Sequence, residues 1–358
     1  MIDLFSLLKD TSAYKAIKND KESGKLSHAY LVVCADGDFL SDYLKIFAKL
    51  ICCKNSDPCG NCRACRLIEE KRYPDATFYP ASGETVSVAD VNDLIEKSYL
   101  RPIEGDAKIF VIEKGDTMTA AAQNKLLKTL EEPPAGTYIL IGARSEFPIL
   151  STVKSRVKKS EVSAFSDEKL FAALKSEFKD EEKLKNAISC GDGTVGSVVG
   201  FYSDEKLADI EKFAEELIND MQSSKNVLDY SLKADALIGE LIKEYKSVNA
   251  GKIPKEAAKS PDALKRYCLP VVTEKIFSVL EAYFRDMLCY YEGKENLVFN
   301  AERLSRVKTA KGYNAASLVY ALDKINEARK RKYFNGSGAM LNEWLLFSIL
   351  EGKHKWQK

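Results

Sequence analysis

Three cysteines stand at two successive C-x-x-C spacings, Cys59, Cys62 and Cys65, and Cys53 precedes the first of them by six residues. Thiolates at this spacing can converge tetrahedrally on one Zn²⁺, and four of them complete its coordination shell. A complete shell leaves no position for water, so such a metal is structural rather than catalytic. The pattern therefore predicts a structural Zn²⁺ site made by these four cysteines, with Cys52 as the alternative to Cys53.

Free or redox-active thiols are the alternative interpretation of this cluster, although a redox motif requires only one C-x-x-C. We expect the isolated cysteines to be buried small apolar side chains; they are Cys34, Cys190, Cys268 and Cys289. His28 opens an apolar run with no carboxylate pattern nearby, which favours a structural role over a catalytic one. Nothing else in the sequence predicts a nucleophile, a paired-carboxylate site or a cofactor loop.

Length and composition indicate a soluble protein of two or three domains. The chain has 358 residues, of which 45% are hydrophobic and 30% charged, as in ordinary globular proteins. A formal net charge of +1 argues against a protein-wide basic surface for nucleic acid, so any contact with DNA is expected to be local or shared with partners. We see no export signal and no apolar run near the ~20 residues that a membrane span needs, which predicts a cytoplasmic protein without membrane contact.

The elements that must position the cysteines follow an alternating pattern. Apolar runs predict three strands, at 29–33, 108–112 and 137–142, and helices are expected at 41–53 and 118–132. Strands that alternate with helices of this length indicate a parallel sheet with helices on both faces. Pro133 and Pro134 should end the second helix, because proline disfavours helical geometry before it and cannot donate a backbone hydrogen bond.

The rest of the chain is expected to be helical. Three short helices are predicted, at 166–178, 180–188 and 195–202, and longer helices follow from about residue 203, with a loop at 248–261. One long helix carries apolar residues at 3.6-residue spacing from Ile276 to Tyr291, which is typical of a packing face in a core or a subunit interface.

Several motifs occur together in the order found in one protein family. They are His28-Ala29-Tyr30-Leu31, the cysteine cluster, the strand at 108–112, Leu126-Leu127-Lys128-Thr129-Leu130-Glu131-Glu132-Pro133-Pro134, and Ser155-Arg156. In these motifs the chain resembles the clamp-loader subunits of bacterial DNA polymerase III, which are AAA+ proteins, and most closely the ATPase-inactive delta-prime type. The resemblance covers roughly residues 1–200. Beyond them, only residues 335–350 look like the family's final collar helix.

This resemblance implies an α/β plus all-α architecture of three domains. Residues 1–165 would form an AAA+-like, RecA-type α/β domain with the cysteine module at 53–65 inserted in it. Residues 166–205 would form a small helical lid, and residues 206–358 a helical collar that joins subunits.

The place where this family's ATPases carry a P-loop lacks the residues that hold phosphate. A P-loop supplies glycine amides, then a lysine and a hydroxyl for the terminal phosphates and Mg²⁺. Aligned on His28, the segment reads Gly37-Asp38-Phe39-Leu40-Ser41, so Leu40 takes the place of the lysine and Phe39 that of the glycine before it. Asp36 and Asp38 place negative charge at the helix N-terminus, where a triphosphate would need the opposite. We expect no ATP at this site.

The strand at 108–112 supports the same interpretation. In a motor subunit it would be followed by an Asp-Glu pair, one carboxylate for Mg²⁺ and one to activate water. Here Glu113-Lys114 follows the strand, so a cation stands where the water-orienting residue is expected.

Ser155-Arg156 matches most of the family's Ser-Arg-Cys pattern, and Val157 replaces its cysteine. In the family this arginine reaches the γ-phosphate bound by a neighbouring subunit, where a planar guanidinium neutralises developing charge. The resemblance therefore implies that Arg156 acts in trans, with Ser155 in support, although an isolated Ser-Arg would ordinarily be a solvated surface pair. Neighbouring lysines could add a local basic edge or simply be solvated; they are Lys154, Lys158 and Lys159.

The expected function is that of a non-hydrolysing stator subunit of the clamp loader, with no catalytic site of its own. Its expected partners are the gamma/tau motor subunits, the delta subunit, primed DNA through the assembly and, indirectly, the sliding clamp. The alternatives are a divergent active AAA+ ATPase, which Leu40 and Lys114 disfavour, and a zinc-dependent DNA-binding module, which the near-neutral charge disfavours.

Overall fold

A computed structural model describes residues 2–82, 85–220, 227–249, 253–254, 257–300, 305–306, 313–333, 345 and 348–349. The contacts between residues divide the chain into two compact units. One is Met1–Lys179 with Gly193–Ser197, and the other is Asp180–Asp192 with Val198–Lys358. The three predicted domains, with boundaries at residues 165 and 205, remain a prediction.

The first unit is built on a five-stranded sheet, β1 Ala29–Cys34, β2 Ala76–Tyr79, β3 Lys108–Ile112, β4 Thr137–Ala143 and β5 Lys158–Val162. The strand order is β2-β3-β4-β1-β5 and every pair is parallel. Tyr30 of the interior strand β1 lies opposite Leu140 of β4 on one side and Lys158 of β5 on the other. The three predicted strands, which correspond to β1, β3 and β4, thus belong to one parallel sheet, as the sequence indicates.

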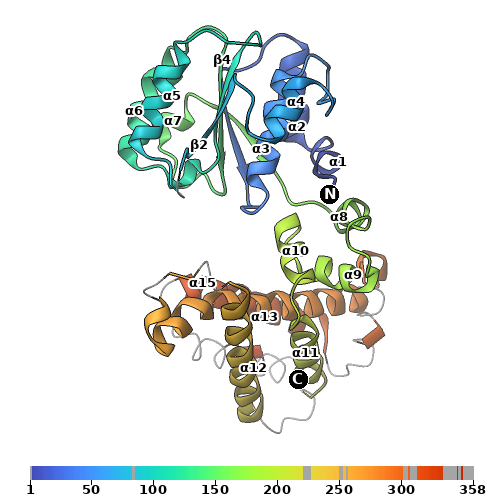
Figure 1. The fold of residues 1–358 in the computed structure, drawn as a ribbon. Coiled ribbons are helices and arrows are strands. Elements are labelled where there is room, and N and C mark those ends of the chain that lie inside the picture. The colour runs from blue at the N-terminus through green and yellow to red at the C-terminus, as the bar shows by residue number, and fades with distance from the viewer. Residues whose placement is uncertain are drawn as a thin grey trace. The chain divides into compact units, whose positions relative to one another are not determined.

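Helices cover both faces of this sheet (Figure 1). The helical elements of this unit up to residue 179 are α1 Leu4–Leu8, α2 Ser12–Glu22, α3 Leu40–Cys52, α4 Arg63–Glu69, α5 Val88–Ser98, the 3₁₀ turn η1 Gly115–Thr117, α6 Ala120–Glu131, α7 Ser151–Lys154 and α8 Asp167–Leu174. Helices α5, α6 and α7 lie on one face, and α2, α3 and α4 on the other. The predicted helix at 118–132 is α6, which ends before the two prolines as expected.

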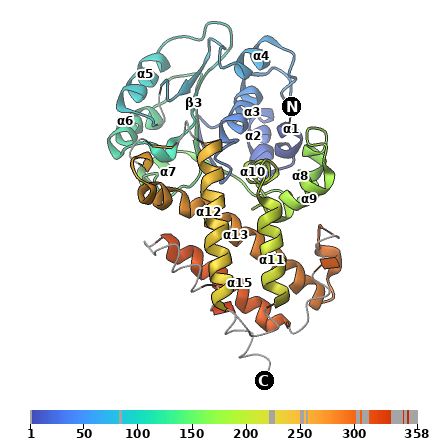
Figure 2. The same ribbon diagram turned by 60° about the horizontal axis from the view of Figure 1, so that its bottom comes forward.

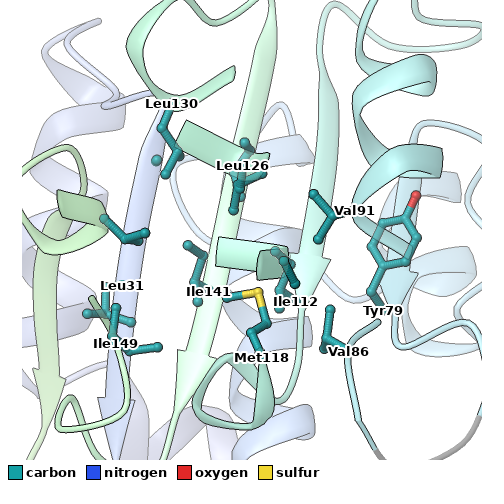
Figure 3. Packing of buried hydrophobic residues seen from close by; sticks show 14 of the residues in the cluster. Leu31, Tyr79, Val86, Val91, Ile112, Met118, Leu126, Leu130, Ile141 and Ile149 are labelled. Atoms are coloured by element: carbon teal, nitrogen blue, oxygen red, sulfur yellow. The ribbon is translucent and has the colours of Figure 1, made fainter. Parts of the chain in front are cut away.

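The face under α5 and α6 holds a continuous apolar core (Figure 3). Leu31, Ile112 and Ile141 point from three neighbouring strands toward Val91 of α5 and Leu126 of α6, and all five side chains are buried. Burial of strand residues on both faces explains why β1, β3 and β4 read as uninterrupted apolar runs.

The second unit is helical in its described residues. Its elements are α9 Glu181–Cys190, the later part of α10 Val195–Tyr202, α11 Leu207–Asp220, α12 Val227–Val248, the 3₁₀ turns η2 Ala257–Lys259 and η3 Glu295–Leu297, α13 Pro261–Tyr291 and α15 Ala315–Tyr333. Helix α13 contacts α11, α12 and α15 (Figure 2). The predicted packing face is largely buried, although Tyr291 is exposed.

The predicted collar helix at 335–350 lies outside the described residues, apart from 345, 348 and 349. Among the helices that the structure describes, none combines the length and the apolar character that crossing a membrane requires.

Candidate functional site

The segments that correspond to a nucleotide site lie at the carboxyl edge of the parallel sheet, where α/β proteins bind ligands. The loop after β1 leads through Phe39 into α3, and Glu113 directly follows β3. Leu40 begins α3 and is only 3% exposed. Its Cδ1 atom lies 3.3 Å from the position that a Cβ atom on Gly142 of β4 would take. The residue at the lysine position therefore packs onto the sheet.

Asp36 is buried in this loop and accepts four hydrogen bonds. Its Oδ1 atom accepts from the backbone N–H of Phe39 (3.3 Å). Its Oδ2 atom accepts from the backbone N–H groups of Val195 (3.0 Å) and Gly196 (3.2 Å) and from the hydroxyl of Tyr43 (3.3 Å). Val195 and Gly196 open α10, so the carboxylate meets the N–H groups that a helix N-terminus offers to anions.

Burial raises the pKa of Asp36 above its usual range, while these hydrogen bonds act in the opposite direction. The backbone at Gly196 also lies very close to Asp36 and Asp38. A Cβ atom on Gly196 would lie 2.6 Å from Oδ1 of Asp36 and 3.1 Å from Cβ of Asp38. Only glycine fits at position 196 while Asp36 keeps this place.

Glu113, the residue after β3, receives both a hydroxyl and a lysine at one carboxylate oxygen. Oε1 of Glu113 accepts from Oγ of Ser41 (2.5 Å) and from Nζ of Lys71 (2.6 Å). Lys71 also lies 5.3 Å from the centre of the Phe78 ring. An ammonium group thus stands beside the two side chains that a P-loop protein uses for Mg²⁺, whereas Lys114 is exposed to solvent.

The backbone at Lys71 has a conformation that usually requires glycine. Its φ angle is +55°. The N–H groups of Lys71 and Arg72 donate to the carbonyls of Ile68 (3.0 Å) and Leu67 (2.7 Å), which is the Schellman pattern at the end of α4. A non-glycine residue in the left-handed region is uncommon and bears conformational strain. The ion pair with Glu113 is the favourable contact that accompanies this strain.

Arg156 follows α7 and precedes the edge strand β5, and one third of its side chain is exposed. Its Nη2 atom lies 2.5 Å from Oε1 of Glu131, the last residue of α6. Its Nη1 atom donates to the carbonyl of Thr152 (2.8 Å) and to Oγ of Ser155 (3.2 Å). Both members of the Ser155-Arg156 pair therefore take part in one hydrogen-bonded arrangement.

The lysines around Arg156 are compensated by carboxylates. Lys158 lies 2.6 Å from Asp20, and Lys159 lies 3.2 Å from Glu146. The local charge at this edge is thus mixed.

Four sulfurs converge at the predicted metal site, and they belong to Cys53, Cys59, Cys62 and Cys65. All four lie within 4.8 Å of one another, and Cys52 is not one of this group. The Sγ atoms of Cys53 and Cys62 are 3.9 Å apart, close to the separation of about 3.8 Å for two thiolates bound 2.3 Å from a tetrahedral Zn²⁺. This donor set and spacing fit zinc.

The electrostatics of the cluster also suit a cation. The backbone N–H groups of Cys62 and Asn61 lower the pKa of the Cys59 thiol to about 6. Burial raises the pKa of the Cys65 thiol, a shift that a bound divalent cation would reverse.

Helix α2 holds the start of the cysteine segment. Nζ of Lys21 donates to the carbonyl of Cys53 (2.6 Å). Asp57 accepts from Nζ of Lys18 and from the hydroxyl of Tyr14, both at 2.7 Å. The Lys18 hydrogen bond, with a smaller contribution from Tyr14, holds the pKa of Asp57 below its usual range.

Comparison with known proteins connects this geometry to a family. Residues 9–166 match the family model described as DNA polymerase III, delta subunit. Residues in this range are also similar to curated delta-prime subunits of clamp loaders, so the N-terminal region resembles that family. The matched region contains the parallel sheet with helices on both faces.

Curated relatives agree with this assignment. Over 166 residues the chain is 31% identical to DNA polymerase III subunit delta' of Haemophilus influenzae, covering 46% of this chain and 51% of the relative. It is 33% identical to subunit delta' of Bacillus subtilis over 40% of this chain and 44% of that protein. Subunit tau of Salmonella typhimurium is 30% identical over 46% of this chain and 26% of its own length. The chain spans about half the length of the delta' relatives or less.

Because delta' and tau subunits are both similar to the same region of this chain, the similarity itself does not separate a hydrolysing subunit from a non-hydrolysing one.

Some residues of this site could not be found from sequence patterns. Lys71 reaches Glu113 across 42 positions of the chain, and Tyr43 and Gly196 reach Asp36 only through the fold. Glu131 lies in the Leu-Leu-Lys-Thr-Leu-Glu-Glu-Pro-Pro motif, which signalled the family but not its contact with Arg156.

Proposed function

We propose that this chain is a non-hydrolysing stator subunit of the bacterial DNA polymerase III clamp loader, which supplies Arg156 to the ATP site of a neighbouring motor subunit. The proposal rests on the charged side chains that lie where an ATPase of this family would bind its nucleotide. Asp36 lies against the N–H groups that could receive a phosphate, and Lys71 lies beside Ser41 and Glu113. Charged side chains of the chain itself thus pair with the Phe39 N–H in the loop after β1 and with Glu113 after β3, at the positions where an ATPase would hold phosphate and Mg²⁺.

The competing function is that of an active motor, as in the gamma and tau relatives. Calorimetric titration of the full chain with Mg·ATP separates the two. We expect no binding, and also none for Leu40→Lys, because Phe39, Asp38 and Asp36 remain in place. Micromolar ATP affinity of the parent protein would support the motor and contradict the stator.

Arg156→Ala tests the action in trans. In the reconstituted loader we expect a partial loss of DNA- and clamp-stimulated ATP hydrolysis. A missing arginine finger can cost on the order of 10³ in rate at one site, and the other motor sites dilute the effect. Arg156→Lys should also reduce turnover, because an ammonium keeps the charge but loses the planar two-pronged donor geometry.

Gel filtration must show that both variants assemble normally, and Arg101→Ala, an exposed arginine elsewhere in the same unit, is the matched control. If Arg156→Ala assembles and hydrolyses ATP at the parent rate, the role in trans is excluded and a scaffolding role is left.

The cysteine cluster would hold one Zn²⁺ through Cys53, Cys59, Cys62 and Cys65, and the metal would supply a cross-link rather than a reaction. We also propose that residues 166–205 act as a lid and residues 206–358 as the collar that joins the motor and delta subunits. Action on primed DNA and the sliding clamp would follow through this cytoplasmic assembly. A DNA-binding assay of the isolated chain at moderate salt tests the alternative of a zinc-dependent DNA-binding module, for which tight binding would be expected.

A further inference from the structure

The guanidinium of Arg156 is held from three sides by parts of its own chain. Glu131 approaches from the end of α6, the carbonyl of Thr152 from α7, and the hydroxyl of Ser155 from the residue before it. Oγ of Ser155 donates in turn to the carbonyl of Thr152 (3.0 Å). Glu131 is the only charged member of this group, so it contributes the strongest directional attraction.

The helix that carries Glu131 also fixes the chain that leads to Arg156. Nε2 of Gln123 in α6 donates to the carbonyl of Pro148 (2.9 Å), and its Oε1 accepts from the N–H of Leu150 (2.8 Å). Gln123 is 1% exposed, so these bonds are shielded from water. Helix α6 thus both carries Glu131 and holds the backbone segment that enters α7.

This arrangement orients the arginine without using up its donors. A free arginine side chain samples many rotamers, and holding it in one geometry beforehand lowers the entropy lost when it meets a phosphate. A guanidinium has five N–H donors, more than three contacts require. The side chains of Arg156 and Glu131 are 33% and 48% exposed, so solvent screens the pair and an incoming phosphate can share the guanidinium.

We infer that Glu131 is a positioning residue for Arg156, an assignment that rests on the proposed role of Arg156 in trans. Glu132, the next residue, is also exposed but forms the end cap of α6. The two adjacent glutamates therefore provide a matched pair for the test.

The experiment compares Glu131→Gln and Glu132→Gln in the reconstituted loader, each alone and combined with Arg156→Ala. Misplacing a catalytic group by about 1 Å can cost on the order of 10²-fold at the affected site, so after dilution by the other sites we expect a loss of roughly twofold or more in stimulated kcat. The KM for ATP, the assembly and the thermal midpoint should stay near the parent values, and Glu132→Gln should have no effect on rate. Adding Glu131→Gln to Arg156→Ala should change nothing further.

A stimulated rate of Glu131→Gln at or above the parent value overturns the positioning role, and a raised rate would mean that Glu131 sequesters the arginine. An equal loss in the Arg156→Ala background also overturns it, because the effect would then not pass through Arg156. If Arg156→Ala itself leaves the rate unchanged, the role in trans fails; if Arg156→Ala lowers the rate and Glu131→Gln does not, only the positioning fails.

Discussion

At the scale of single residues, Asp36 is a buried carboxylate that connects the loop after β1 to α3 and to the start of α10. Four donors from the β1–α3 loop, α3 and the start of α10 meet its carboxylate, and the side chain is 3% exposed. Burying a charge in this way is costly unless hydrogen bonds compensate it. The carboxylate is therefore important for stability.

Asp36→Ala should destabilise the protein by on the order of 2 kcal/mol or more, because it leaves buried N–H groups without an acceptor. The measurement is the free energy of unfolding from urea denaturation. Asp38→Ala is the control: Asp38 is exposed, and surface substitutions usually stay within about 0.5 kcal/mol. Equal values for the two variants would contradict the structural role of Asp36.

At the scale of elements, the central strands could be predicted and the edge strands could not. Strands β1, β3 and β4 are buried on both faces and are therefore largely apolar, with Lys108 and Thr137 at the first positions of β3 and β4. The edges β2 and β5 are short, and β5 reads Lys-Lys-Ser-Glu-Val, as edge strands often do to avoid further pairing. The lysines of β5 suggested a charged surface segment rather than a strand. Its parallel pairing with β1 depends on a distant part of the chain, so the local sequence does not reveal it.

The candidate site, too, could be predicted from the sequence only in part. Local spacing predicted the four thiols that converge, and family motifs drew attention to Arg156, Leu40 and Glu113. Contacts made by Lys71, Glu131 and Gly196 depend on segments that are far apart in the chain, so no local pattern could indicate them.

The cysteine cluster connects two helices. Cys53 caps the end of α3, Cys62 caps the start of α4, and Cys65 lies within α4. Cys62→Ser should therefore lower the zinc content from about one ion per chain and reduce thermal stability, since structural Zn²⁺ contributes directly to folding. Metal analysis of the reduced protein is the measurement.

Cys289→Ser, a half-buried cysteine of the second unit, is the matched control and should keep its zinc. Parent protein that contains no zinc when purified reduced would exclude the metal site. Loss of zinc from Cys52→Ser with retention in Cys53→Ser would move the fourth ligand to Cys52.

At the scale of the whole molecule, the described chain contains two units with cores of their own, one around a parallel sheet and one around α13. Separate cores allow separate unfolding. We expect scanning calorimetry to resolve more than one transition, with the calorimetric enthalpy exceeding the van't Hoff enthalpy. Cys62→Ser should shift one transition and leave the other in place. A single two-state transition that moves as a whole would contradict this independence.

The contact between Asp36 and the start of α10 also has a consequence for how the protein responds to its surroundings. A ligand that bridges two segments stabilises them by RT ln(1 + [L]/Kd), so its effect rises and falls with its concentration. Asp36 is covalently part of the chain, and its concentration at the contact is constant. The contact between the loop after β1 and residues 195–196 is therefore made without any bound ligand, and under the proposed function it would not change with the ratio of ATP to ADP in the cell. In the proposed clamp loader, whose motor subunits would change state with each nucleotide, such a subunit would provide a reference that stays the same throughout the cycle.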